Sequence, residues 1–195
     1  MWTYMPYGPF SSYTEFETWA KTIEGQLDPM FYAILVPDAS TNNGWTPLGL
    51  CAYLRINPDM ASIEVGWLTY SSQLRGTTAS TEAMILMMRY GFSLGYRRYE
   101  WKCNRLNGPS RQAARRLGMG FEGLFKAHFI VKGLNRDTTW YAVTEHQWPE
   151  LNEIFTKWLD PQNFDASGRN KLRLSEMTRH IYDAGCTVKE LQPWA

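Results

Sequence analysis

The sequence Ser71-Ser-Gln-Leu-Arg-Gly-Thr-Thr-Ala-Ser-Thr-Glu-Ala83 joins two strongly apolar segments. Residues 62–70 before it predict a strand, and residues 83–94 after it predict a helix. A strand, a turn of small residues and a helix form a layout in which free backbone N–H groups and the helix dipole bind a phosphate. An ordinary helix start capped by Thr77 or Thr78 explains the same residues, so both interpretations stay open.

Length, charge and cysteine content limit the classes of protein to consider. The 195 residues suffice for one domain with its own core, and a net charge of +1 gives no basic field for nucleic acid or a membrane surface. The three cysteines form no Cys-x-x-Cys pair, and no apolar segment approaches the ~20 residues of a membrane span. We therefore expect a soluble, cytoplasmic protein that binds neither nucleic acid nor membrane, and we predict no metal site.

Apolar periodicity and turn residues predict the order of the elements. A helix from Ser11 or Ser12 to about Gln26 precedes three strands, at 31–36, 48–56 and 61–69, which read as an antiparallel meander. The helix after the central turn should end at Gly95. The later elements are a strand at 97–102, a short helix at 107–118, a hairpin of strands 121–131 and 139–144 around a loop at 132–137, and helices at 149–159 and near 175–184.

This order of elements predicts an α+β (α/β three-layer) fold with a mixed, mostly antiparallel sheet and helices on both faces. We expect a single domain over residues 1–160. Residues 161–195 are polar and are expected to form a helical C-terminal extension.

Six motifs follow one another at characteristic spacing. They are Glu-Val-Gly-Trp at 64–67, Arg-Gly-Thr-Thr-Ala-Ser-Thr-Glu-Ala at 75–83, Gly-Tyr-Arg-Arg-Tyr-Glu-Trp-Lys-Cys-Asn at 95–104, Asn-Gly-Pro-Ser-Arg-Gln-Ala-Ala-Arg-Arg-Leu-Gly at 107–118, Phe-Glu-Gly at 121–123 and Lys-Gly-Leu-Asn-Arg-Asp at 132–137. In this order they resemble the GNAT acetyltransferase superfamily, specifically its RimJ/RimL-like branch. The resemblance covers roughly residues 1–165 and implies acetyl-CoA as donor and a primary amine as acceptor.

The chain departs from the family pattern in two places. Thr77 and Thr78 stand where the Gln/Arg-x-x-Gly-x-Gly/Ala signature often has a second glycine. The chain also begins almost at Trp2, so the first strand and helix of the family fold are expected to be missing. A second subunit could complete the acceptor side, which would make the protein a homodimer.

The resemblance implies which residues bind CoA. Pantetheine is expected between strands 61–69 and 97–104, paired with Trp67 and Leu68, while Gly66 either permits a bulge there or simply packs. The diphosphate is expected on the turn residues Arg75, Gly76, Thr77, Thr78 and Ala79.

The short helix at 107–118 is expected to supply further CoA contacts. Asn107 would lie beside the cofactor arm, or it is only a helix cap. Arg111 and Arg115 lie one turn apart and could reach the adenosine 3′-phosphate, or they form a solvated helix face.

Acetyl transfer needs a neutral amine, a donor for the developing oxyanion and a proton for the leaving thiolate. The Leu68 N–H is expected to be the oxyanion donor, and the resemblance places Ser110 Oγ near the sulfur as proton donor. Glu64, acting directly or through water, is the first choice of base and Glu100 the second; either can instead be a surface or paired residue. Ser110 can also be a plain first-turn residue.

The acceptor side is less defined by the sequence. His128 and Asp137 are candidates for it, with packing for His128 and a turn at 135–137 as the competing explanations. No cysteine has a histidine partner nearby in sequence, so direct attack in a ternary complex is expected. A catalytically weak acyl-CoA-binding or interaction module remains the alternative function, motivated by the missing strand and helix.

Overall fold

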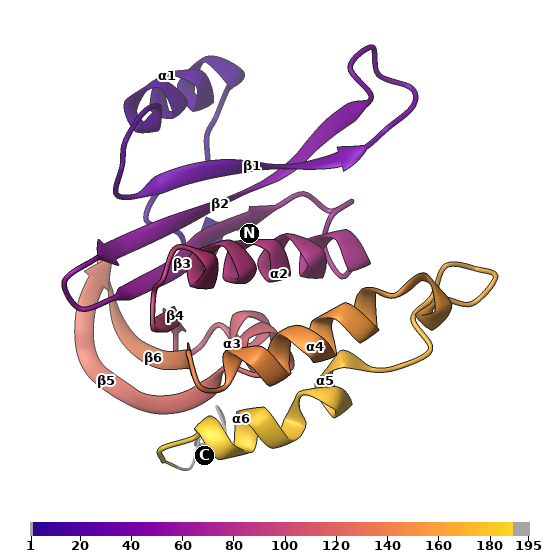
Figure 1. The fold of residues 1–195 in the computed structure, drawn as a ribbon. Coiled ribbons are helices and arrows are strands. Elements are labelled where there is room, and N and C mark those ends of the chain that lie inside the picture. The colour runs from indigo at the N-terminus through magenta and orange to yellow at the C-terminus, as the bar shows by residue number, and fades with distance from the viewer. Residues whose placement is uncertain (1, 189–195) are drawn as a thin grey trace. The chain divides into compact units, whose positions relative to one another are not determined.

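The computed structural model describes residues 2–188 of the chain. Its contacts divide the chain into two compact units, Met1–Met87 and Met88–Ala195, and the boundary falls within helix α2 (Thr78–Ser93) (Figure 1). The predicted boundary at residue 160 stays a prediction. No helix in the described part of the chain is both long enough and apolar enough to cross a bilayer.

The first unit is built on the predicted antiparallel meander. Strand β1 (Met30–Pro37) pairs with β2 (Trp45–Asn57), and β2 pairs with β3 (Ser62–Tyr70), both antiparallel. Helix α1 (Tyr13–Ile23) begins as predicted, because Ser12 Oγ accepts the Glu15 N–H. The three strands and α1 confirm the prediction for this part of the chain.

The aromatic residues at the start of the chain form one cluster within this unit. They begin with a 3-10 turn, η1 (Trp2–Tyr4). Tyr7 stacks on Trp19 of α1 with ring centroids 4.3 Å apart, and Trp19 meets Phe31 of β1 edge to face. Rings from the lead-in, from α1 and from β1 thus form one half-buried cluster.

The second unit contains three further strands, which pair with one another in antiparallel fashion. Strand β6 (Leu134–Thr144) lies between β4 (Arg98–Asn104) and β5 (Gly120–Val131) and pairs with both. Its helices are α3 (Gly108–Arg116), α4 (Trp148–Leu159), α5 (Leu174–Met177) and α6 (Arg179–Gly185), with a 3-10 turn η2 (Pro161–Asn163) after α4. The combination of mostly antiparallel strands and helices confirms the α+β class.

Two predicted elements are corrected here. The hairpin loop is not 132–137 but only Lys132 and Gly133, which have φ values of 51° and 75°. Two successive residues at positive φ match the twist of a tight hairpin, so β6 already begins at Leu134. The helix predicted near 175–184 is two short helices that meet at Thr178.

The residues after α4 pack onto the rest of the second unit. Thr178 Oγ1 donates to Arg116 O at the end of α3, and Thr187 N donates to Phe121 O of β5. Leu174, Ile181 and Tyr182 are buried. This segment is polar in composition, but its apolar residues belong to the core of the unit.

Candidate functional site

The turn between β3 and α2 is closed by its own backbone. Leu74 N and Arg75 N both donate to Ser71 O, and the buried Leu74 side chain anchors the turn. Gly76 follows at φ 72°, a conformation that favours glycine. A Cβ at Gly76 would meet no atom within 4 Å, so the space in front of this backbone is open.

The start of α2 satisfies both interpretations of the sequence. Thr77 Oγ1 accepts the Ser80 N–H at 3.1 Å, which makes Thr77, not Thr78, the capping residue. Within residues 2–188, no acceptor takes the N–H groups of Gly76 and Ala79. Arg75 is exposed beside them. The turn therefore offers backbone donors and a cation to an anion while still capping the helix.

Strand β3 carries the expected bulge, but at a different residue. Leu50 of β2 faces Thr69 and Ala52 faces Gly66, so Trp67 and Leu68 together oppose one residue. The unusual backbone is at Trp67, with φ 52°. Gly66 is a packing glycine, because a Cβ there would lie 3.1 Å from Leu54 Cδ2.

Tyr7 supports this bulge and was not identified from the sequence. Its hydroxyl donates to Trp67 O at 3.3 Å and lies 2.9 Å from Thr69 Oγ1. Burial raises the pKa of Tyr7 to about 12, against the opposing effect of the Thr69 hydrogen bond, so the phenol stays protonated at neutral pH. The sequence signal was the aromatic density of the lead-in, which does not single out Tyr7.

The two carboxylates proposed as bases are both ion-paired. Glu64 is buried, and its Oε1 accepts from Arg55 Nη1 at 2.8 Å. Glu100 accepts from Arg98 Nε and Lys102 Nζ, each at 2.6 Å. Burial acts to raise the pKa of Glu100, but these two hydrogen bonds outweigh it and lower that pKa. The paired-residue alternative thus describes both carboxylates.

Ser110 and Asn107 lie together at the start of α3. Asn107 Oδ1 accepts the Ser110 N–H at 3.3 Å, which makes Asn107 the N-cap. Ser110 Oγ accepts from Trp101 Nε1 at 3.0 Å, and the nearby Cys103 Sγ lies 3.2 Å from Thr139 Oγ1. Burial raises the pKa of the Cys103 thiol, which disfavours a thiolate nucleophile there. The capping bond uses only the backbone of Ser110, so its hydroxyl is available for another role.

The two arginines of α3 have different surroundings. Arg111 is buried, and its guanidinium donates to Arg105 O at 3.2 Å and to Tyr141 Oη at 3.4 Å. Arg115 is exposed, with its guanidinium 5.1 Å from the Tyr182 ring centroid. The alternative that Arg111 belongs to a solvated helix face is therefore wrong, because its side chain is buried. The shared phosphate contact stays a prediction.

The acceptor-side candidates lie on the β5–β6 hairpin. His128 packs against Phe129, with ring centroids 3.9 Å apart. Asp137 lies in β6, not in a turn, and its Oδ1 accepts from Ala127 N at 2.8 Å and from Asn135 Nδ2 at 3.0 Å. These hydrogen bonds, the backbone one foremost, lower the pKa of Asp137. Both residues have structural explanations, and their acceptor role stays a prediction.

Within residues 2–188, no three His, Cys, Asp or Glu side chains lie close enough together to bind a metal ion.

The strand–turn–helix with open backbone donors is a layout in which proteins bind phosphate-bearing ligands. In a comparison with protein families, residues 1–120 match the family model of the acetyltransferase (GNAT) domain. The chain belongs to the GNAT acetyltransferase family. The comparison with curated proteins found no match.

Solved structures agree with this assignment. A GCN5-related N-acetyltransferase from Brucella melitensis is 42% identical, with a TM-score of 0.84 over 91% of this chain and 78% of its own. A protein from Chromobacterium violaceum assigned to the GNAT acetyltransferases is 36% identical, with a TM-score of 0.69 over 76% of this chain and 72% of its own. The predicted GNAT fold is confirmed.

Proposed function

We propose that this chain transfers the acetyl group of acetyl-CoA to a primary amine, either a small molecule or a protein N-terminus, by direct attack in a ternary complex. The observation that supports this most is the turn before α2. It combines the exposed Arg75, a glycine at positive φ and two backbone N–H groups without acceptors within residues 2–188. We further propose that the protein is cytoplasmic and belongs to the RimJ/RimL-like branch.

The residues of the turn fit a diphosphate. The N–H groups of Gly76 and Ala79 would donate to its oxygens, and the absence of a side chain at Gly76 leaves the backbone accessible. Arg75 is exposed and would supply the mobile cation. Asn107 and Arg115 are the contacts we expect for the rest of the CoA.

Two groups of the chain would act on the reacting atoms. The bulge at Trp67 and Leu68 interrupts the regular ladder with β2, which suits the Leu68 N–H to serve as oxyanion donor. Ser110 Oγ accepts from Trp101 Nε1, so the indole orients the serine hydroxyl. The proton of that hydroxyl then points away from the indole and can go to the departing sulfur. Because Glu64 is held by Arg55, we expect it to remove the amine proton only through water.

A thermal-shift titration with acetyl-CoA, with ATP as control, tests this proposal. At ~100 times the dissociation constant a ligand adds about 2.7 kcal/mol to the unfolding free energy. For a chain of this size the melting temperature should rise by about 5–10 °C. A rise with acetyl-CoA but not with ATP supports the proposal. No rise with either ligand would show that acetyl-CoA is not the acetyl donor.

A second function is favoured by one observation, the pairing of both candidate bases. If neither Glu64 nor Glu100 can accept a proton, the chain would be a catalytically weak acyl-CoA-binding module. Release of CoA in the presence of any primary amine separates the two functions, since a binding module gives the thermal shift without turnover.

A further inference from the structure

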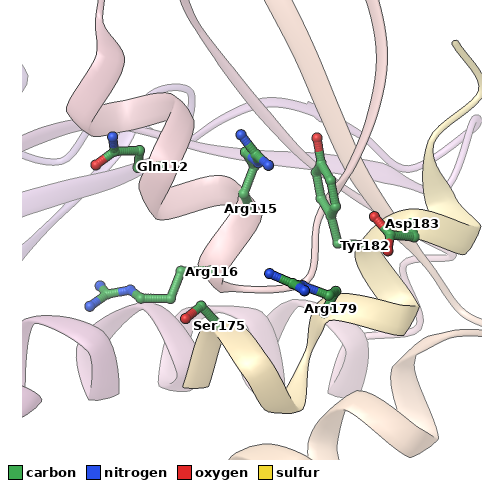
Figure 2. Close-up of a pocket in the computed structure, with 7 residues that line it drawn as sticks. All are labelled: Gln112, Arg115, Arg116, Ser175, Arg179, Tyr182 and Asp183. Carbon is green, nitrogen blue, oxygen red and sulfur yellow. The ribbon is translucent and has the colours of Figure 1, made fainter. Parts of the chain in front are cut away.

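A pocket of about 340 Å³ lies in the second unit, between α3 and the short helices α5 and α6 (Figure 2). Its size falls in the range of small-molecule sites. Seven residues line it: Gln112, Arg115 and Arg116 from α3, Ser175 from α5, and Arg179, Tyr182 and Asp183 from α6.

The charge of this pocket is strongly positive for its size. Three arginines and one carboxylate, Asp183, line the pocket, so its lining residues carry a formal charge of +2 in a chain whose net charge is only +1. The other lining side chains, Gln112 and Ser175, add neutral hydrogen-bond donors. The pocket therefore favours an anion that accepts several hydrogen bonds.

Ordinary helix electrostatics explain only part of this charge. Arg115 and Arg116 lie in the last turn of α3, where cations are favourable in any helix. Arg179 is the first residue of α6, an end where the helix dipole disfavours a cation. Among residues 2–188 no carboxylate forms an ion pair with Arg179. Its position is explained better by a ligand than by its own helix.

The pocket is also held in shape. The Arg115 guanidinium lies over the Tyr182 ring, which is 8% exposed. Thr178 Oγ1, one residue before Arg179, donates to Arg116 O and so fixes α6 against α3. The positions of the arginines on the two helices are thus coupled through packed contacts rather than by a loop.

We infer that this pocket binds a phosphoryl group, because guanidinium forks match phosphate oxygens in pairs. The group could belong to the 3′-phosphate of CoA, which rests on the proposed function, or to a separate phosphorylated small molecule. The chemistry of recognition is the same in both cases, and Arg179 is its distinguishing residue.

Calorimetric titration with inorganic phosphate tests the inference without any acetyl transfer. We expect Arg179→Gln to weaken phosphate binding by at least about tenfold, as loss of a charge-assisted hydrogen-bond pair does. The matched control is Arg173→Gln, which removes the same charge from a side chain 82% exposed outside the pocket. No binding by the natural chain, or equal binding by both variants, would overturn the inference.

A second titration identifies the source of the phosphoryl group. If it is the CoA 3′-phosphate, Arg179→Gln should abolish the preference for CoA over dephospho-CoA. If that preference is unchanged while phosphate binding is lost, the ligand is a separate phosphorylated molecule. Failure of the proposed acetyl transfer would leave the phosphate titration unaffected, so the two proposals fail independently.

Discussion

Ser110 has two connections that can be separated by mutation. Its backbone N–H is capped by Asn107, whereas its hydroxyl accepts from the Trp101 indole. We expect Ser110→Ala to lower kcat about a hundredfold by removing the proton donor, with little change in acetyl-CoA affinity. The buried indole N–H loses its acceptor, which costs about 1 kcal/mol of unfolding free energy.

The control for this prediction is Asn107→Ala, which removes the helix cap at a similar cost of about 1 kcal/mol. Steady-state kinetics should show its effect in KM for acetyl-CoA rather than in kcat. If Ser110→Ala and Asn107→Ala had the same kinetic profile, Ser110 would be a structural residue of the helix start.

Tyr7 gives a prediction in alkaline solution. Folding raises its pKa from about 10 to about 12, so the folded state favours the protonated phenol. This contribution to stability is complete below pH 10 and is lost as the pH rises to about 12. Urea unfolding at a series of pH values should show that loss in the natural chain and less of it in Tyr7→Phe.

Tyr7→Phe should also lower kcat several-fold, because the ring stays on Trp19 while the Trp67 carbonyl loses its donor. Tyr13→Phe is the matched control, since the Tyr13 side chain is 75% exposed. Equal alkaline profiles in Tyr7→Phe and Tyr13→Phe would contradict the raised pKa of Tyr7, and equal kcat values would show that Tyr7 does not hold the bulge.

At the level of residues, the sequence predicted what depends on neighbours along the chain. The caps at Ser12, Thr77 and Asn107 follow from side chains three residues from the N–H groups they accept. The sequence could not predict hydrogen bonds between distant residues, such as that of Tyr7 with Trp67, which are 60 residues apart. Such pairs depend on strand register, and a bulge shifts the register by a residue that no local pattern reports.

At the level of elements, the turn before α2 is tested by glycine substitution. Gly76→Ala should cost about 1 kcal/mol, because alanine is strained at φ 72°. It should also weaken acetyl-CoA binding several-fold, since the Cβ enters the open space in front of the backbone donors. Unfolding and calorimetric titration measure the two effects.

Gly133→Ala is the matched control for this substitution. Gly133 has φ 75° and also has nothing within 4 Å of a Cβ, but it lies in the β5–β6 turn. The same loss of stability with unchanged acetyl-CoA affinity is expected. Equal affinities for the Gly76 and Gly133 variants would mean that the turn before α2 does not bind the cofactor.

The elements themselves were largely predictable because their periodicity is strong. The meander of β1–β3 and the helices α1, α2, α3 and α4 agree with the prediction. The β5–β6 hairpin was misjudged because Lys132 takes positive φ without being glycine or asparagine. A turn that relies on lysine in this conformation has no clear sequence signal.

At the scale of the whole chain, the second unit depends on the close approach of α6 to β5. A Cβ at Gly120 would lie 2.2 Å from the backbone of Gly185, so Gly120→Ala must displace one of them. We expect a loss of at least about 1–3 kcal/mol. Gly123→Ala, in the same strand with nothing within 4 Å of its Cβ, should cost much less.

Thermal unfolding of the two variants checks this prediction. Equal melting temperatures would show that the residues after α4 contribute little to the second unit. The sequence missed this role because the segment is polar in composition. Its few apolar residues, Leu174, Ile181 and Tyr182, are nevertheless buried.

The proposed reaction is tested most directly by mass spectrometry of the protein mixed with acetyl-CoA and a panel of primary amines. Direct attack predicts an N-acetylated amine, CoA released in equal amount and a protein of unchanged mass. An acetylated protein formed before the product, or no acetylated amine from any member of the panel, would contradict it.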